Sequence, residues 1–448
     1  MDFSTVKSVA APSGQWSVSV DPAAVDVLKL SDDDWFGIGV LETMRRSRDL
    51  LSFGLVDGSR RTARTDPRTA ATEWTGRLSG RDFGKAFEVH DVLSNPHLQL
   101  AAPVLPGLID PARFGALVDL IHSGQQGPPS QAAFDLLSIL VGGDDGWFHA
   151  PVSYGASSLG ALLALESNVF NGSVVQLGTY VPEAAQKLDP YLRSLFVTPF
   201  TEWFYDLRPI GSGNKLDLGQ TFGAYLDGYG VAPTVVFRNL PFFEVDPESD
   251  EWFGLDLHYV DPSEISDEDL GRSGSERFTL FSARGPIFSP TASLALWGAS
   301  GGRVPAFEFS GTGARPLSSD VARHGVRLLD VVDGLSPLTP ANGLTGERTT
   351  PLDSIVERTD SLYRLYRNSP STVSGTLRLN LLRPEIRIGT RAQYDGREYY
   401  VHQVEHSGSI DRRSGLLTGQ TSLTIVRGQL YDPPPDAESP RAWRTVGP

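Results

Sequence analysis

The chain contains no cysteine among its 448 residues. Disulfide bonds, zinc sites built on thiolates, iron–sulfur clusters and cysteine nucleophiles are therefore excluded. The chain also lacks any apolar run approaching the roughly 18 residues that a membrane-spanning segment needs. Its first residues, MDFSTVKSVAAPSGQW, do not have the basic and then apolar segments of a secretory signal. We therefore expect a protein that is made and folded in a cytoplasm.

Basic residues are scarce relative to acidic ones. The chain has 39 Lys and Arg against 54 Asp and Glu, for a formal net charge of -15. A protein that binds duplex DNA stably needs cations to displace the counterions of the phosphates. Stable nucleic-acid binding is therefore not expected, whereas an acidic surface is compatible with DNA that slides past without adhering.

The residues that are abundant favour a β-rich protein. The 46 glycines and 32 prolines indicate many turns, which are typical of chains built from short strands. At roughly 100–200 residues per domain, the length predicts two to four domains. The fold class that we expect is mainly β, of the α+β type.

Strand patterns dominate the beginning of the chain. Alternating apolar residues predict strands within residues 15–56, and the dipeptide Asp57-Gly58 is typical of a turn. The polar, Arg- and Thr-rich residues 59–73 indicate a long exposed hairpin tip. A short helix is expected around Arg81–Glu88.

Helical and strand patterns alternate over the rest of the chain. Two short helices are expected within 107–142, with Asp110 and Ser130 as N-caps. Further helical segments are expected at 157–170, 182–196, 220–230, 318–331 and 352–370. Short strands return from about residue 171, and residues 375–428 read as four or five antiparallel strands. The tail after Gly428 is Pro-rich, which predicts an extended or disordered segment.

His402 and His406 lie four residues apart, a spacing that would put both on one face of a helix. The flanking residues favour a strand, because Asp395-Gly396 is a turn dipeptide and the segment 399–401 is aromatic and β-branched. Four residues along a strand span about 13 Å, which is too far for both imidazoles to bind one zinc ion at about 2.0–2.1 Å. We therefore predict no metal site. One face of this strand is expected to carry Tyr400, His402, Val404 and His406.

Two further patterns are compatible with catalysis but lack its context. GASGG at 298–302 matches a nucleophile elbow around Ser300, but Pro305 and a strand-like run follow where a helix should begin. Acidic clusters could supply the paired carboxylates of a glycoside hydrolase, but they stand in polar, loop-like runs. These clusters are Asp32 to Asp34, Asp144 with Asp145, Glu248 with Asp250 and Glu251, and Asp267 to Asp269. We predict no catalytic residue and, since no nucleotide-binding fingerprint is complete, no cofactor.

The C-terminal segment carries the most informative pattern. RPEIRIGTRAQYDGREYYVHQVEHSGSI, followed by TSLTIVRG, resembles the closing strands of the baseplate hub proteins of contractile phage tails and related contractile injection systems. The matching positions are Gly389, Arg391, Tyr399, Tyr400, Val401, Val404, His406, Thr421, Leu423, Arg427 and Gly428. Three earlier segments, 78–88, 264–281 and 323–370, are similar to the family in the same order. They contribute Gly80, Arg81, Asp82, Arg272, Ser273, Gly325 and Arg327.

The resemblance implies a structural protein without enzymatic activity. Hub proteins of this family are homotrimers in which each chain supplies two similar β-barrel tube domains, so that three chains form a pseudo-hexameric ring. The ring joins the six-fold tail tube to the three-fold central spike and encloses a channel for genome passage, which would be acidic here. The implied partners are the tail tube protein, the central spike protein, baseplate wedge proteins and the C-terminus of the tape-measure protein. DNA would pass without stable binding, no membrane insertion is implied, and the location would be the tail baseplate of a virion assembled in the cytoplasm of a bacterial host.

The resemblance also predicts a division of the chain, with similar segments ETMRRS at 42–47 and EDLGRS at 268–273 as a trace of duplication. We expect the fold to be two similar β-barrel tube domains with helical and loop insertions. The predicted parts are a first tube domain at 1–105, a helical insertion at 106–170, the first part of a second tube domain with inserted loops at 171–315, a helical segment at 316–371, closing strands at 372–430 and a Pro-rich tail at 431–448.

One alternative from another class stays open. A carbohydrate-binding or glycan-degrading virion-associated β-protein would explain the acidic pairs and the Trp147 and Trp252 that stand in polar runs. The segment GGDDGWFHA at 142–150 could contact sugar or Ca²⁺, although it matches no defined loop pattern.

Overall fold

The computed structural model covers two β-sheets and the helices packed on them. The residues that it describes are 2–23, 25–31, 34–42, 47–70, 72–92, 126–127, 129–141, 163–168, 175–176, 186–196, 201–209, 215–217, 231–241, 255–272, 277–284, 318–332, 362, 366, 372–411, 414 and 416–430. Within this part of the chain, no helix is long and apolar enough to cross a membrane.

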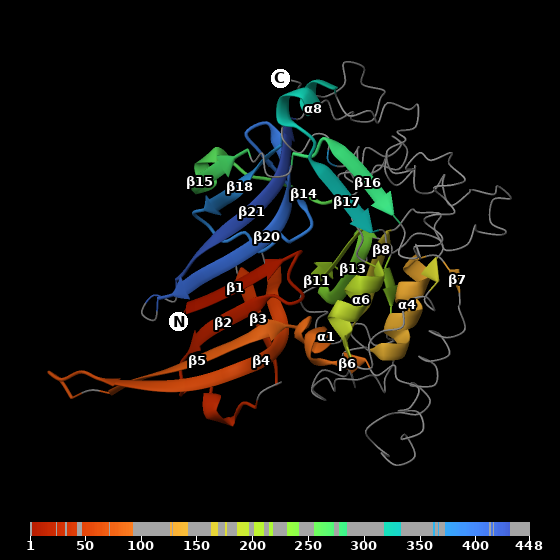
Figure 1. The fold of residues 1–448 in the computed structure, drawn as a ribbon. Helices are drawn as coiled ribbons and strands as arrows, with labels where there is room; N and C mark the ends of the chain where they lie inside the picture. Colours follow the sequence, from red (N-terminus) through yellow and green to blue (C-terminus); the bar gives the residue numbers. More distant parts are fainter. Residues whose placement is uncertain are drawn as a thin grey trace, which may run out of the picture.

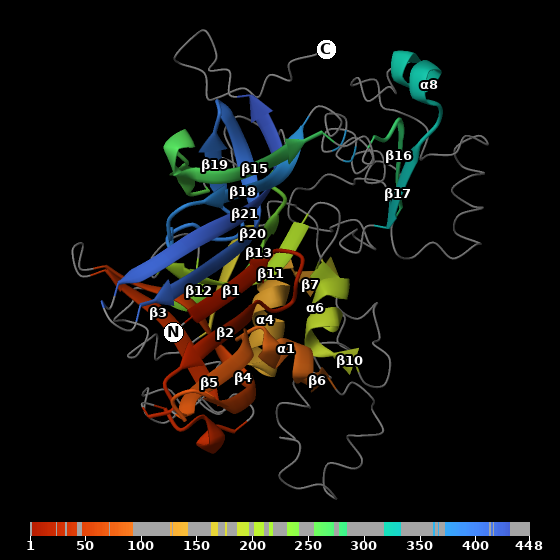
Figure 2. The ribbon, with the colours of Figure 1, turned by 90° about the vertical axis from the view of Figure 1, so that its left-hand side faces the viewer.

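An 11-stranded sheet combines the two ends of the chain. Its strands are β1 (Asp2–Ser8), β2 (Gln15–Val20), β3 (Trp35–Glu42), β4 (Ser47–Thr65), β5 (Thr72–Asp82), β14 (Leu257–Tyr259), β15 (Ile265–Gly271), β18 (Val373–Leu379), β19 (Arg391–Tyr394), β20 (Arg397–Ile410) and β21 (Leu417–Leu430). The main order is β15-β18-β21-β20-β1-β2-β5-β4-β3, with β14 and β19 attached through β20. Because β1 pairs antiparallel with β20, the red N-terminal and blue C-terminal strands form one continuous sheet (Figures 1 and 2).

A second, four-stranded sheet lies beside the first. Its order is β11 (Thr201–Pro209), β13 (Val231–Asn239), β8 (Ala164–Asn168) and β12 (Lys215–Asp217). The helices α1 (Lys85–Val89), α4 (Pro129–Leu140) and α6 (Leu188–Phe196) lie on its far side from the C-terminal strands (Figure 1). The remaining elements are the strand pairs β6 (Asp91–Val92) with β10 (Gln186–Lys187), β7 (Gln126–Gly127) with β9 (Val175–Gln176), β16 (Leu280–Arg284) with β17 (Leu328–Val332), the helix α8 (Ser318–His324), and 3-10 turns at Val27–Lys29 and Pro262–Glu264.

The strand β11 is buried on both faces, and this explains its unusual sequence. Trp203, Tyr205 and Leu207 point into a core that also contains residues of α4 and α6. Phe204, on the opposite face, belongs to a separate core with the C-terminal strands. Successive side chains of a strand alternate between faces, so TEWFYDLRP carries apolar residues toward the helices. Its even-numbered positions, three of which are charged, lie toward the 11-stranded sheet.

The prediction of a mainly β fold is confirmed, and most of the expected strands are present. The hairpin tip at 59–73 is also present, but the turn at Asp57-Gly58 is wrong. The strand β4 continues through this dipeptide with a register shift between Val56 and Gly58, and turns only after Thr65. An extra residue accommodated as a bulge bends a strand without ending it.

Two expected helices are strands in part. Within 157–170, residues Ala164–Asn168 form β8, which lies between β13 and β12. The apolar run ALLAL at 161–165, which leads into this strand, has no alternation to distinguish it from a helix. Within 318–331, α8 ends at His324, and Gly325 with φ +74° leads into β17. Ser130 lies in the first turn of α4 and not before it, since the helix begins at Pro129.

The predicted face of β20 is also corrected. A register shift between Val401 and Gln403 places an extra residue in the strand, and this reverses the alternation there. Val401, Val404 and His406 are therefore all buried, whereas Tyr400 points to the other side and is buried against β11. Several predictions fall outside the described residues, among them those on Asp110, Asp144, Asp145, Trp147, Trp252, Ser300, most of 352–370 and the tail after residue 430.

Candidate functional site

The family-motif positions fall in three parts of the fold. Gly80, Arg81 and Asp82 end β5, while the C-terminal group, from Gly389 to Gly428, lies on β19, β20, β21 and the turn before them. The structure therefore places both of these groups on the 11-stranded sheet. Arg272 is exposed just after β15, Gly325 and Arg327 connect α8 to β17, and Ser273 lies outside the described residues. This third group does not join the other two.

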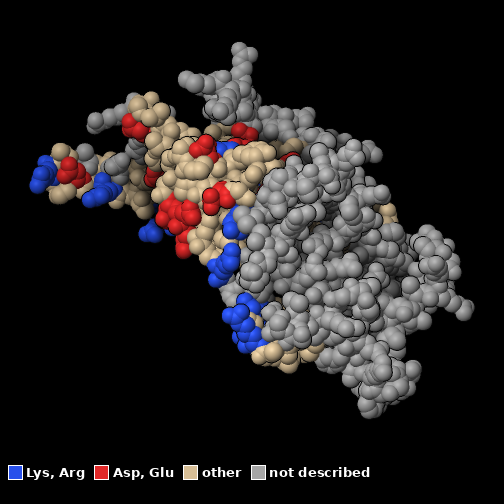
Figure 3. Space-filling view, turned by 90° about the horizontal axis from the view of Figure 1, so that it is seen from above, with Lys and Arg blue, Asp and Glu red and all other residues tan. Residues whose placement is uncertain are grey.

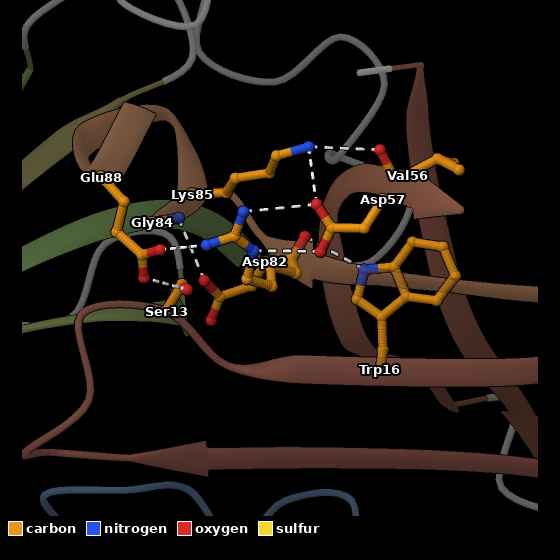
Figure 4. Close-up of polar contacts among 9 residues, drawn as sticks. Ser13, Trp16, Val56, Asp57, Asp82, Gly84, Lys85 and Glu88 are labelled. Carbon is orange, nitrogen blue, oxygen red and sulfur yellow. Dashed lines mark hydrogen bonds and ion pairs between the residues drawn. The ribbon is translucent and has the colours of Figure 1, made fainter. Parts of the chain in front are cut away.

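Arg81 is the centre of an ionic network that connects β5 to β4 and α1 (Figure 4). Its Nε lies 3.0 Å from Asp57 Oδ2, and its other side contacts Glu88. Lys85 Nζ lies 2.8 Å from Asp57 Oδ1 and also donates to the carbonyl of Val56 at 3.2 Å. Partial burial alone would raise the pKa of Asp57, but hydrogen bonds from Arg81 and Lys85 outweigh it and lower that pKa. The network fixes α1 against the bulged part of β4.

Asp82 is buried beside this network. One of its oxygens accepts a hydrogen bond from the Gly84 amide at 3.0 Å, and the other has no hydrogen-bond partner among the described residues. Burial raises the pKa of Asp82 to about 6, although the nearby Lys7 opposes the shift. A carboxyl group in this position stabilises the β5–α1 turn through its neutral form as well as its charged form.

A second network joins β11 and β13 to the C-terminal strands. Arg238 Nε donates to Glu202 Oε1 at 2.6 Å, and the Tyr400 hydroxyl donates to Glu202 Oε2 at 2.6 Å. The guanidinium of Arg238 also donates to the carbonyl of Gly389 at 2.7 Å. Burial would lower the pKa of Arg238, but Glu202 raises it overall, so this cation stays charged. The ion pair joins β11 to β13 within one sheet, and its hydrogen bonds to Tyr400 and Gly389 connect it to the C-terminal strands, the satisfied arrangement in which a buried pair is tolerated.

A third polar cluster lies where β1 crosses β11. Lys7 Nζ lies 3.3 Å from Asp206 Oδ1, and Arg208 donates to the carbonyl of Ile388 at 2.8 Å. His406 is adjacent, with its Nδ1 3.2 Å from Thr421 Oγ1. Burial, together with the nearby cations Arg387 and Lys7, lowers the pKa of His406 to about 3, so the ring is neutral at physiological pH. The pocket between these residues has a volume of about 10 Å³, enough for about one water molecule.

Two glycines of the motif allow the sheets to approach each other. Gly389 has φ +70°, and a Cβ atom there would lie 2.5 Å from the Phe204 ring. A Cβ at Gly428 would lie 2.1 Å from the ring of Tyr399. Any larger residue at either position would therefore displace a buried aromatic side chain.

Arg391 and Glu398 form the remaining buried pair of the motif. The two side chains lie 3.0 Å apart on adjacent strands, and Arg391 also donates to the carbonyl of Leu255 at 2.8 Å. The bonds of Arg391 therefore hold the segment before β14 against β19. Each motif side chain with a bond to another element serves the same purpose, which is to fix the packing of strands.

The described residues offer little to a metal or a small ligand. They include no group of three or more His, Cys, Asp or Glu side chains that could hold a metal ion. A wider pocket of about 360 Å³ lies along β1, β2 and β5, and is lined largely by polar side chains such as Ser4, Ser17, Ser79 and Arg81. It lacks the apolar lining that is usual in small-molecule sites.

Sequence reasoning missed the charged partners contributed by β1, β11 and β13. These are Lys7, Glu202, Asp206, Arg208 and Arg238, of which each is at most 8% exposed. A signal was present, because charged residues at alternate positions of a strongly apolar strand indicate a second buried face. The residues with which they would pair could not be read from spacing, since Lys7 and Asp206 are 199 positions apart.

Comparisons with known proteins find solved structures that are similar to this chain, and three of them follow. No protein-family profile matches the chain, and no curated protein matches its sequence. The tail protein from Neisseria meningitidis MC58 is 12% identical with a TM-score of 0.42, covering 95% of this chain and 91% of that one. The 43 kDa tail protein of prophage MuSo2 from Shewanella oneidensis is 12% identical with a TM-score of 0.39, covering 95% and 92%. The Francisella PdpA–VgrG complex is 9% identical with a TM-score of 0.36, covering 95% of this chain and 53% of that one.

The likeness extends along nearly the whole chain. At identities of 9–12% it concerns the fold alone. The function is therefore argued from the residues themselves.

Proposed function

We propose that this chain is a structural baseplate hub of a contractile phage tail. In this role it forms a homotrimer whose pseudo-hexameric ring joins the six-fold tail tube to the three-fold central spike. The division into two tube domains with insertions, the acidic channel and the partners implied by the resemblance are parts of the same proposal. The protein acts by its shape and not by catalysis.

The strongest support for the proposal comes from where the motif residues lie and what they contact. In the C-terminal group, Arg391, Tyr400 and His406 are buried and bonded to other strands, and none of them lines an opening large enough for a substrate. Catalytic groups need access to a substrate, whereas a ring that transmits force needs layers that do not slide. The buried Lys7–Asp206 ion pair and the hydrogen bonds of Tyr400 and Arg238 between the two sheets meet the second requirement.

The net charge of -15 is compatible with the proposed channel. Acidic side chains at the lumen would repel DNA phosphates and keep the genome from adhering during passage. This part of the proposal would fail if the assembled ring retained duplex DNA on a sizing column at physiological salt.

Measuring the oligomeric state tests the central claim. Analytical ultracentrifugation of the purified chain, alone and with its cognate central spike protein, should give a species of three chains of 48.6 kDa each. Electron microscopy should then show this species stacked on tail-tube hexamers. A chain that stays monomeric under all of these conditions would refute the proposal.

The glycan alternative has its own test. Hydrolysis of peptidoglycan and host polysaccharides would be assayed with the intact protein and with Asp144→Asn and Asp145→Asn, two positions outside the described residues. Activity that both substitutions abolish would favour the alternative, and the hub proposal predicts no activity in any of the three proteins.

A further inference from the structure

One segment of the protein extends beyond the body without a covering layer. Strands β4 and β5 stay paired from Arg61 opposite Gly76 to Thr65 opposite Thr72, whereas the third strand, β2, ends its pairing at Val20 opposite Gly76. Residues 62–75 therefore form a two-stranded ribbon that projects from the sheet (Figure 1). We call residues 60–77 the arm, and its base includes Arg77, which pairs with Ser19 of β2. An isolated two-stranded ribbon is marginally stable in water, so a partner surface would stabilise it.

The arm is basic although the chain is acidic. It contains five arginines and two acidic residues, whereas the whole chain has a net charge of -15. The arginines, all of them exposed, are Arg60, Arg61, Arg64, Arg68 and Arg77. Figure 3 shows basic side chains beside acidic ones at the projecting end, and acidic side chains gathered on the body.

The arrangement within the arm indicates that it is built for contact. Arg60 and Arg77 are directly opposite each other in the register, and like charges in this position destabilise a ribbon unless an anion lies between them. On the other face, the guanidinium of Arg61 lies 4.9 Å from the ring centroid of Trp74, a side chain that is 48% exposed. Tryptophan and arginine are the residues most enriched at the centres of protein interfaces. The turn is held by Asp66, which accepts from the Arg68 amide at 2.8 Å and the Thr69 hydroxyl at 2.9 Å.

A complementary surface lies at the opposite end of the same sheet. Strand β15 is the last strand at that end, and it exposes Asp267, Glu268 and Asp269 in succession. Asp267 makes only a surface contact with Arg378 at 3.4 Å, with both side chains 61% exposed. These three exposed charges are all negative, whereas the arm has an excess of positive charge, so the two surfaces attract each other.

We infer that the arm of one copy docks on the acidic strand β15 of a second copy of this chain. Two different patches on each copy make a head-to-tail contact, which closes into a ring where the rotation between copies divides a full turn and otherwise gives an open filament. The inference rests on the proposed ring and names the surfaces that would hold it together. Arginine on one side and carboxylate on the other would also speed the encounter of the copies at low salt.

A charge-reversal series tests this contact with the full chain. The arm variant carries Arg60→Glu and Arg77→Glu, which keep a like-charge pair within the ribbon and so preserve its internal repulsion. The strand variant carries Asp267→Lys and Asp269→Lys, and a third variant carries all four substitutions. Arg323→Glu, on the exposed surface of α8, is the matched control. Sedimentation velocity at low and high salt gives the apparent dissociation constant of each.

We expect the arm and strand variants each to dissociate about tenfold or more readily than the unmodified chain at low salt, because like charges would now face each other. The four-substitution variant should associate again, and the Arg323→Glu control should not change. Circular dichroism identifies any variant that fails to fold. The absence of cysteine allows a second measurement, in which Arg60→Cys with Asp269→Cys is treated with a short bismaleimide linker. It should give covalent dimers and trimers, and Arg323→Cys with Asp269→Cys should not.

The outcomes separate the inference from the proposed function. If the unmodified chain forms a trimer but neither reversal weakens it and the linker gives no covalent oligomer, the arm contact is wrong and the ring still stands. If the arm reversal alone prevents binding to purified tail tube while the trimer persists, the arm serves another protein and the inference is again overturned. A chain that never associates removes both the ring and the contact.

Discussion

Replacing Arg238 with methionine tests whether the motif residues hold the sheets together. The substitution retains most of the volume of the side chain but removes the cation from Glu202, which is 5% exposed, and a donor from the carbonyl of Gly389. Removing one partner of a buried ion pair leaves an uncompensated charge and costs about 3–5 kcal/mol. We expect a loss of that size in the free energy of unfolding.

Urea unfolding followed by circular dichroism measures this loss. The linear dependence of the free energy on urea concentration gives the stability of each variant. Arg378→Met is the matched control, because Arg378 forms an ion pair with Asp267 in which both side chains are 61% exposed. Exposed pairs contribute about 0–1 kcal/mol, so this variant should remain close to the unmodified protein.

A double substitution separates the ion pair from general packing. If Glu202→Gln is added to Arg238→Met, the buried anion disappears while Tyr400 keeps an acceptor for its hydroxyl. The double variant should then be more stable than Arg238→Met alone, and the cycle completed with Glu202→Gln alone gives the coupling of the two charges. A loss below about 1 kcal/mol in Arg238→Met, within the range of an exposed pair, would refute the reasoning that these charges fix the layers.

Three further predictions concern packing and pH. Gly428→Ala should destabilise the protein by about 1–3 kcal/mol in urea unfolding, because a Cβ atom 2.1 Å from the Tyr399 ring must push it aside, and an unchanged midpoint would contradict the packing argument. His406, whose pKa falls to about 3 on folding, contributes stability that is present above its unfolded pKa and lost as pH falls toward 3. His406→Gln should therefore flatten the acid side of the stability curve, and an unchanged slope there would contradict this assignment. Asp82, whose pKa rises to about 6, has the opposite sign, since its contribution is present below its unfolded pKa of about 4 and lost as pH rises through 6. Asp82→Asn should therefore make stability rise more steeply with pH between about 4 and 6, and a shallower slope there would refute the raised pKa.

Much of the fold could be predicted because its strands have solvent on one side. The alternation of apolar and polar residues in β1, β2 and the C-terminal strands can be recognised in the sequence, and so can the polar tip of the arm. β8 could not be identified, since the apolar run that leads into it at 161–165 shows no period of two. The bulges at Asp57 and His402 could not be foreseen either, because a bulge depends on the partner strand and not on the local sequence.

Only the C-terminal strands of the candidate site could be predicted from the sequence. The motif positions of β20 and β21 were found from their order, but the side chains that they contact come from β1, β11 and β13. Tyr400 and Glu202 are 198 residues apart, and contacts at such separations are set by topology. Charged residues in the apolar strand β11 were the available signal, and they predict a buried partner without identifying it.

The proposed contact with the arm would protect the outer strand β15 of the large sheet. Among the described residues, the outer strands of this sheet are β3, β15 and the short β14, and an outer strand offers its free backbone groups to any other chain. Three successive acidic side chains on β15 discourage pairing with most strands of this acidic protein, because like charges would meet. The same charges attract a strand that carries arginine. The basic arm of a second copy carries charge that complements β15, and a contact that excludes wrong partners also selects the right one.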